Sequence, residues 1–255
     1  MSDLLRFLRE FSEAARAVTL GASVPVADNK AGEGAYDPVT ELDRAAERVL
    51  RATIEARFPE DGIEGEEYGV TRSEAARRWV LDPIDGTRAL ICGLPSWTTL
   101  VALVEDGEPV AGFIDSPVLG ELAIGWQGGA VLHAGGERPL RVSGCRTLAD
   151  ARLATTDVYL FNGDEVDTFS RVRNQVPVTR YGLDALAYAK LAAGSIDLVI
   201  ESGLKTHDWS ALVPVVRGAG GVVGNWQGGT DLSSGSIVAA ASDQLFEQAV
   251  RTLAA

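Results

Sequence analysis

Two aspartates, Asp82 and Asp85, stand three residues apart in the segment 82–87, Asp-Pro-Ile-Asp-Gly-Thr, directly after the apolar run 79–81. A buried strand would stop at the first carboxylate, because a proline cannot continue a regular ladder. A helix beginning at Thr87 would leave the N–H groups of Gly86 and Thr87 free to bind phosphate oxygens. Two acids beside an anion site repel each other unless a hard divalent ion bridges them. The spacing favours a metal and phosphate site, with a structural turn capped by Asp85 as the alternative.

Three further acids could complete such a site, and each has a simpler explanation when it is taken alone. Glu66 lies in an acidic stretch that could be a solvated loop. Asp208 could be a helix N-cap. Asp43 forms with Thr40 the pattern of a capping box, Thr-Glu-Leu-Asp, which opens a helix.

The overall composition restricts the possible partners. The chain has 255 residues, 23 of them basic and 36 acidic, and its formal net charge of −13 argues against nucleic acid or an anionic membrane. Its apolar runs are shorter than the ~20 residues of a membrane-spanning helix, and no cationic leader precedes an apolar block. The two cysteines, Cys92 and Cys145, are more typical of reduced thiols than of a disulfide. We expect a cytoplasmic protein whose acidic surplus either keeps it soluble or holds divalent metal.

The elements that must position these acids differ between the two halves of the chain. In the first half, helical patterns give way to strand-like runs separated by turns, which indicates an antiparallel meander. Helices are expected at residues 3–20 and 40–57, a loop at 27–34, strands at 79–81, 97–104, 110–116 and 122–126, and a hairpin at 128–136.

In the second half, strands alternate with helices, as in an α/β arrangement. Strands are expected at residues 153–156 and 196–200, an extended segment at 176–180, and helices at 164–174, 185–193 and 208–217. We expect an N-terminal α+β domain over residues 1–145 that carries most of the metal ligands. A C-terminal α/β domain over residues 146–255 would carry Asp208 and the substrate contacts, with the site between the two.

The order of the motifs resembles that of the inositol-monophosphatase family. The matching segments span residues 39–221 and read Val-Thr-Glu-Leu-Asp at 39–43, Gly-Glu-Glu at 65–67, Trp-Val-Leu-Asp-Pro-Ile-Asp-Gly-Thr at 79–87, His-Asp-Trp-Ser-Ala-Leu at 207–212 and Gly-Ala-Gly-Gly at 218–221. The central segment is highly specific and the others are weaker. One departure is His207, because the family often has Trp directly before the acid. The resemblance implies a layered αβαβα sugar-phosphatase fold, a homodimer, and a phosphatase that Li⁺ inhibits.

The resemblance also implies a set of metal ligands. Glu66, Asp82 and the carbonyl of Ile84 would hold a first Mg²⁺. Asp82, Asp85 and Asp208 would hold a second, and Glu66 could reach a third, looser ion. No Cys, Ser or His nucleophile is needed, so water would attack the phosphate directly.

Catalytic and phosphate-binding roles follow in the same way. Asp43 and Thr87 would orient and activate the attacking water, with Glu66 assisting through the metal. The amides of Gly86 and Thr87 would bind phosphate. Lys30 lies where the family often places an element that closes the metal site, and a solvated loop lysine is an equally good interpretation.

Two further segments, 85–97 and 179–188, are similar to the branch of the family that acts as histidinol-phosphate phosphatase. That branch tends to have Arg after Gly-Thr, here Arg88, and Tyr-Gly-x-Asp before a helix, here ending at Asp184. Carboxylates of Asp184 and Glu201 would suit the ammonium and imidazole of histidinol phosphate. Carboxylates also accept bonds from hydroxyl groups, so these acids do not exclude a polyol, and Asp184 could be a helix cap.

Other interpretations therefore stay open. Within the family, the substrate could be inositol 1-phosphate, a sugar bisphosphate or a 3′-phosphonucleotide. A protein of another class, a non-catalytic metal-binding scaffold, should have lost an acid, and this chain keeps all four acidic ligands. His207 and His133 are expected to be structural or solvent-facing.

Overall fold

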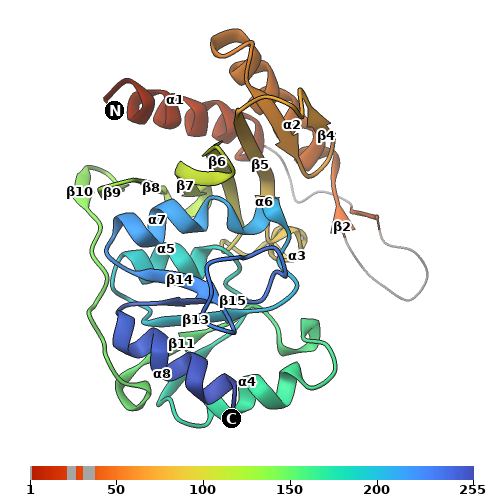
Figure 1. The fold of residues 1–255 in the computed structure, drawn as a ribbon. Helices are drawn as coiled ribbons and strands as arrows, with labels where there is room; N and C mark the ends of the chain where they lie inside the picture. Colours follow the sequence, from red (N-terminus) through yellow and green to blue (C-terminus); the bar gives the residue numbers. More distant parts are fainter. Residues whose placement is uncertain (1, 22–26, 31–37) are drawn as a thin grey trace.

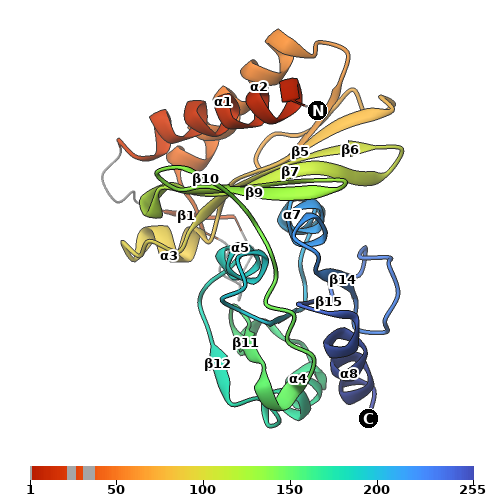
Figure 2. The ribbon, with the colours of Figure 1, turned by 90° about the vertical axis from the view of Figure 1, so that its left-hand side faces the viewer.

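The computed structural model describes residues 2–21, 27–30 and 38–255, and in this part of the chain helices and sheets stack in five layers (Figure 1 and Figure 2). From one side to the other, the layers are α1 (Ser2–Thr19) with α2 (Glu41–Arg57), an eight-stranded sheet, α5 (Leu186–Ala192) with α7 (Leu212–Gly218), a five-stranded sheet, and α4 (Glu165–Arg173) with α8 (Asp243–Leu253). The expected layered αβαβα fold is confirmed.

The eight-stranded sheet is an antiparallel meander with one parallel pair, β3 with β5. In sheet order its strands are β10 (Glu137–Pro139), β9 (Gly129–His133), β8 (Glu121–Trp126), β7 (Glu108–Ser116), β6 (Thr98–Glu105), β5 (Arg77–Asp85), β3 (Gly62–Gly65) and β4 (Gly69–Thr71). The predicted meander and hairpin are confirmed. Strands β3 and β4 were not predicted, because they are too short to show an alternating pattern.

Helices α1 and α2 cover the outer face of this sheet and fix where β5 lies. The rings of Phe7 and Phe11 on α1 pack against Trp79 on β5, at centroid distances of 5.6 and 6.0 Å. The predicted capping box at the start of α2 is present, since Thr40 caps the helix and its N–H donates to Asp43 over 2.9 Å. Asp43 is thereby held fully buried near the end of β5 that carries the acids.

The five-stranded sheet contains one strand that runs antiparallel to the other four. In sheet order its strands are β12 (Val178–Arg180), β11 (Arg152–Ala154), β13 (Leu198–Glu201), β15 (Ile237–Ala240) and β14 (Val222–Asn225), and the first three are parallel. Strands β14 and β15 and helix α8 were not predicted from the sequence. Helix α7, from the second half of the chain, packs against β7 and β8 of the first sheet, and the domain division at residue 145 stays a prediction.

The site-bearing elements differ from the prediction in two places. Strand β5 continues to Asp85 instead of stopping at Asp82, and its register against β6 shifts between these two residues. Pro83 and Ile84 therefore interrupt the ladder without ending the strand. The helix predicted at 208–217 is divided into α6 (Thr206–Trp209) and α7, so Asp208 lies inside α6 and is not its N-cap.

The remaining short elements lie at the edges of the layers. Helix α3 (Thr87–Ile91) begins directly after Gly86, as predicted. Strand β1 (Asp28–Asn29) pairs with β2 (Pro38–Val39). Strand β1 lies in the segment predicted as a loop, 27–34, and residues 31–34 of that segment lie outside the described residues. The 3₁₀ turns within the described part of the chain are η1 (Pro117–Leu119), η2 (Leu148–Asp150) and η3 (Val158–Leu160). Over the described residues, we find no helix with both the length and the apolar character needed to cross a membrane.

Candidate metal and phosphate site

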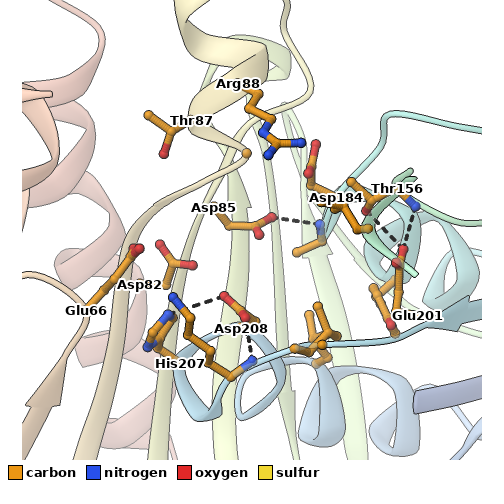
Figure 3. Close-up of a pocket in the computed structure, with 18 of the residues that line it drawn as sticks. Glu66, Asp82, Asp85, Thr87, Arg88, Thr156, Asp184, Glu201, His207 and Asp208 are labelled. Carbon is orange, nitrogen blue, oxygen red and sulfur yellow. Dashed lines mark hydrogen bonds and ion pairs between the residues drawn. The ribbon is translucent and has the colours of Figure 1, made fainter. Parts of the chain in front are cut away.

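A cavity of about 420 Å³ lies where the end of β5 and the start of α3 meet residues of the second half of the chain (Figure 3). Ten of the sequence-predicted site residues line it: Glu66, Asp82, Ile84, Asp85, Gly86, Thr87, Arg88, Asp184, Glu201 and Asp208. The eleventh, Asp43, does not line the cavity, but its carboxylate accepts a hydrogen bond from the hydroxyl of Thr87, which does. The fold thus gathers side chains that are distant in the sequence.

Asp82, Asp85 and Asp208 form the acidic centre of this cavity. Each offers one carboxylate oxygen, and the three oxygens lie within 4.8 Å of one another. Backbone N–H groups hold two of these acids, Ala185 donating to Asp85 over 2.7 Å and Lys205 to Asp208 over 2.6 Å. Oδ1 of Asp82 is buried and has no hydrogen-bond partner. A buried acceptor without a donor is costly, which fits an oxygen that serves as a ligand for a cation.

The electrostatics of the acids also fit a cation. Burial raises the pKa of Asp82 well above its ordinary value, and the charge of Glu66 raises it further. Burial likewise raises the pKa of Asp85, with Asp184 as the next cause. Ionising several carboxylates in one buried place is unfavourable without a counter-charge. Hard carboxylate oxygens at this spacing are ligands of the kind that Mg²⁺ takes, so the residues present fit a divalent metal.

Glu66 reaches the cavity from the turn after β3, and the ammonium group of Lys30 balances the charge of its carboxylate. Nζ of Lys30 lies 2.9 Å from Glu66 Oε1 and 2.5 Å from Glu67 Oε1. Burial alone would raise the pKa of Glu66, and the bond from Lys30 lowers it below its ordinary value. The turn itself is held by Glu47 of α2, whose buried carboxylate accepts from the N–H groups of Glu67 and Tyr68 over 2.7 and 3.2 Å.

Thr87 links the cavity to Asp43. Its hydroxyl lies 3.3 Å from Asp43 Oδ1 and 3.1 Å from the carbonyl oxygen of Ile84, so two acceptors compete for one proton. Burial raises the pKa of Asp43, and hydrogen bonds from Thr40 oppose the rise. A buried carboxylate behind a hydroxyl can receive a proton that passes through that hydroxyl.

Gly86 allows the backbone to turn tightly between β5 and α3. Its φ of +84° lies in the left-handed region that favours glycine, and its carbonyl accepts the first helical bonds, from Ala89 and Leu90. A Cβ at this position would lie 3.1 Å from Asp184 Oδ2 and 3.3 Å from the Cα of Trp97. The N–H groups of Gly86 and Thr87 precede the helical ladder, as an anion cradle requires.

A second pair of acids lies away from the metal-binding centre, where Asp184 and Glu201 face the cavity (Figure 3). Glu201 accepts from the N–H and the hydroxyl of Thr156, over 2.7 and 2.9 Å. Burial raises the pKa of Glu201 to about 8. Burial raises the pKa of Asp184 to about 6, although Arg88 beside it lowers the value (Figure 3).

Several lining residues were missed by the sequence analysis. Thr156 and Tyr188 face the cavity, and so does His207, whose Nε2 lies 3.5 Å from Asp208 Oδ1. His207 was expected to be structural or solvent-facing, and its neighbour Asp208 was the signal for its place in the lining. The signal for Tyr188 is its position in the first turn of the helix predicted to follow Asp184. Thr156 carries no signal in its local sequence.

Comparison with known proteins gives a family match over nearly the whole chain. The model of the inositol monophosphatase family matches residues 5–255. The bifunctional phosphatase IMPL2, chloroplastic, of Arabidopsis thaliana is 42% identical over 227 residues, which cover 85% of this chain. The match covers 65% of that relative, so the chain spans less than two thirds of its length.

Two further relatives match over most of both chains. A histidinol-phosphatase of Mycobacterium tuberculosis is 36% identical over 214 residues, covering 79% of each protein. Among solved structures, an inositol monophosphatase from Zymomonas mobilis has a TM-score of 0.87 and 37% identity, covering 100% of this chain and 98% of that one.

Proposed function

Since the chain belongs to the inositol monophosphatase family and is a phosphoric monoester hydrolase, we propose that it hydrolyses a small phosphate monoester with Mg²⁺, preferably histidinol phosphate. The observation that carries the metal part is the approach of three carboxylate oxygens, from Asp82, Asp85 and Asp208, to within 4.8 Å of one another. The observation that carries the substrate part is the second pair of acids, Asp184 and Glu201, in the same cavity.

The acids divide into two sets of ligands in this proposal. Glu66, Asp82 and the carbonyl of Ile84 would hold one Mg²⁺, Asp82, Asp85 and Asp208 would hold another, and Glu66 could contact a third ion. When bound, the ions screen the charge of the phosphate, lower the pKa of water and stabilise the leaving oxygen. Nζ of Lys30 lies 2.9 Å from Oε1 of Glu66, so an ion bound at this oxygen would compete with Lys30 for it.

The protein's own groups prepare the attack of water on phosphorus. The N–H groups of Gly86 and Thr87 would bind phosphate oxygens and fix the orientation of the ester. The hydroxyl of Thr87 would accept a proton from the attacking water and pass its own proton to Asp43, 3.3 Å away. Burial raises the pKa of Asp43 and makes its carboxylate a better proton acceptor.

The preference for histidinol phosphate is based on charge. Asp184 and Glu201 would bind the ammonium and the imidazole of the alcohol part, and Arg88 would hold Asp184 in its ionised form. The alternative is inositol 1-phosphate or another polyol, sugar or nucleotide phosphate, because carboxylates also accept bonds from hydroxyl groups. Relatives at similar identity bear both names, histidinol-phosphatase and inositol monophosphatase.

A phosphate-release assay with purified protein and Mg²⁺ tests both levels of the proposal. We expect a kcat/KM for histidinol phosphate at least about tenfold above that for inositol 1-phosphate, a sugar bisphosphate or a 3′-phosphonucleotide. Equal values would remove the claim about the substrate and leave the phosphatase. Absence of Mg²⁺-dependent release from every ester would favour the non-catalytic scaffold. Li⁺, competing at a Mg²⁺ site, should inhibit the release.

Two further assignments rest on the family resemblance and the composition. We propose a homodimer, which light scattering after size-exclusion chromatography would test against a mass of 26.9 kDa for one chain. We also propose a cytoplasmic location and a small-molecule substrate, because a net charge of −13 does not suit nucleic acid or anionic lipid.

A further inference from the structure

The cavity contains a second buried polar atom without a partner. Among the described residues, six buried side-chain atoms lack a hydrogen-bond partner, and the two in this cavity are Oδ1 of Asp82 and the hydroxyl oxygen of Tyr188. Tyr188 is only 1% exposed, so bulk water does not reach it freely. Buried hydroxyl groups nearly always have a partner. The free oxygen of Asp82 suits a cation, whereas the free hydroxyl of Tyr188 suits a hydrogen-bonding partner on a ligand.

Tyr188 lines the same cavity as the metal-binding acids and Glu201. Tyr188 stands one turn after Ala185, whose N–H binds Asp85, and helical side chains lean toward the helix N-terminus. Burial and then the charges of Glu201, Asp85 and Asp208 raise the pKa of Tyr188 well above its ordinary value. The hydroxyl therefore keeps its proton and is available as a hydrogen-bond donor.

This donor complements its surroundings. Asp184 above about pH 6 and Glu201 above about pH 8 are ionised and can then only accept hydrogen bonds. Glu201 already accepts from Thr155 and Thr156. An alcohol that offers donors alone would satisfy the acids and leave the hydroxyl of Tyr188 unpaired. An alcohol with a donor and an acceptor on neighbouring atoms would satisfy both kinds of group.

We propose that Tyr188 is a specificity-determining residue whose hydroxyl donates a hydrogen bond to an acceptor in the alcohol part of the substrate, an imidazole nitrogen or a hydroxyl oxygen. The inference rests on the proposed function, because it concerns the leaving-group end of the same cavity. It implies that the enzyme discriminates against phosphate esters of apolar alcohols, since these leave a buried donor unpaired.

The test compares Tyr188→Phe, which removes only the hydroxyl, with the control Tyr159→Phe. Tyr159 is 92% exposed and does not line the cavity. With Tyr188→Phe, kcat/KM for histidinol phosphate should fall about tenfold to a hundredfold, mainly through KM. The value for phenyl phosphate, whose alcohol part has no such acceptor, should change less than about twofold, and the Mg²⁺ concentration for half-maximal rate should not change.

Two kinetic results would overturn the role of Tyr188. Equal losses for both esters, or a shift in the Mg²⁺ requirement, would mean that the hydroxyl supports the metal-binding acids. No loss for either ester would mean that it meets only water. Calorimetric binding of histidinol phosphate with Ca²⁺ in place of Mg²⁺ separates this inference from the proposed function. If wild-type protein hydrolyses neither ester, the proposed function fails, and weaker binding to Tyr188→Phe still supports the contact, whereas equal or absent binding overturns it.

Discussion

The backbone N–H of Ala185 donates a 2.7 Å hydrogen bond to Oδ2 of Asp85. Ala185 follows Asp184, whose φ of +48° is uncommon for a residue with a side chain. The segment that carries one candidate substrate acid is therefore attached directly to a candidate metal ligand. Gly86 tightens this attachment, because even a Cβ there would come within 3.1 Å of Asp184. A change in the backbone conformation at Asp184 and Ala185 should consequently alter the position of the Asp85 carboxylate.

Replacing Asp85 by Asn tests the metal-binding centre. Loss of one negative ligand should lower kcat/KM by at least about a hundredfold and weaken Mg²⁺ binding measured by calorimetry. Without metal, the variant should be at least as stable as wild type, because a buried like-charge repulsion is removed. A purely structural aspartate would show the opposite, a loss of stability in EDTA and an unchanged affinity for Mg²⁺.

Asp167→Asn is the matched control for this substitution. Asp167 is exposed on α4, in the outermost helical layer. It should keep the activity, the Mg²⁺ affinity and the thermal midpoint of wild type. A scaffold without catalysis would give no Mg²⁺-dependent turnover with wild type, Asp85→Asn or Asp167→Asn.

Much of the metal-binding centre could be predicted from the sequence, because the residues that indicate it lie close together along the chain. Asp82, Pro83, Asp85 and Gly86 lie within five positions, and backbone rules alone predict a strand end followed by a helix start. The helix start is confirmed, whereas the strand continues to Asp85. The capping box of α2 also depends only on residues close together in the sequence, and Thr40 and Asp43 form it as predicted.

Contacts between distant segments could not be read in this way. Lys30 binds Glu66, which lies 36 positions later in the sequence, and Ala185 binds Asp85, which lies 100 positions earlier. Short elements were also lost, as with β3, whose four residues show no clear period. Helix α6 packs against β5, and the helical pattern in the sequence does not reveal the break between α6 and α7.

Glu201 should make substrate binding depend on pH. Burial raises its pKa to about 8, so the carboxyl is neutral below that pH and ionised above it. A cationic alcohol part binds the ionised form, and the ionised fraction rises on the order of tenfold between pH 6.5 and 8. KM for histidinol phosphate should fall accordingly over this interval, as measured by initial rates at saturating Mg²⁺.

The matched comparison uses Glu201→Gln and phenyl phosphate. The variant cannot ionise, so its KM for histidinol phosphate should lose this dependence on pH. Phenyl phosphate should show only the titration of its own phosphate with both proteins. A parallel pH profile for the two esters would place the titrating group at the phosphate end.

Glu47 should position Glu66 although it does not line the cavity. It is fully buried, and besides the N–H groups of Glu67 and Tyr68 it binds Arg51 over 2.7 Å. Glu47→Gln leaves the guanidinium without its counter-charge, which should cost about 1–3 kcal/mol of stability. It should also weaken Mg²⁺ binding about tenfold to a hundredfold, as measured by calorimetry.

Glu55→Gln, an exposed change on the same helix, is the control for the helix itself. It should alter neither the stability nor the affinity for Mg²⁺. If Glu47→Gln lowered stability alone, with Mg²⁺ affinity preserved at a temperature where the variant is folded, Glu47 would be structural only.

Asp197 should stabilise the second half of the chain in a manner that depends on pH. Its side chain, 1% exposed, lies 2.7 Å from Nε of Arg152 and accepts from the backbone N–H of the same residue over 2.8 Å. Burial alone would raise the pKa of Asp197, and the bonds from Arg152 and Ser143 lower it below its ordinary value. Because the folded pKa is depressed, the stabilisation is present above the unfolded pKa, near 3.9, and is lost as pH falls through the folded pKa.

Asp197→Asn should lower the free energy of unfolding at pH 7 by about 1–3 kcal/mol, and the difference from wild type should shrink below about pH 4 in urea titrations. A difference that stayed constant down to pH 3 would mean that the packing of this side chain, and not its charge, provides the stabilisation.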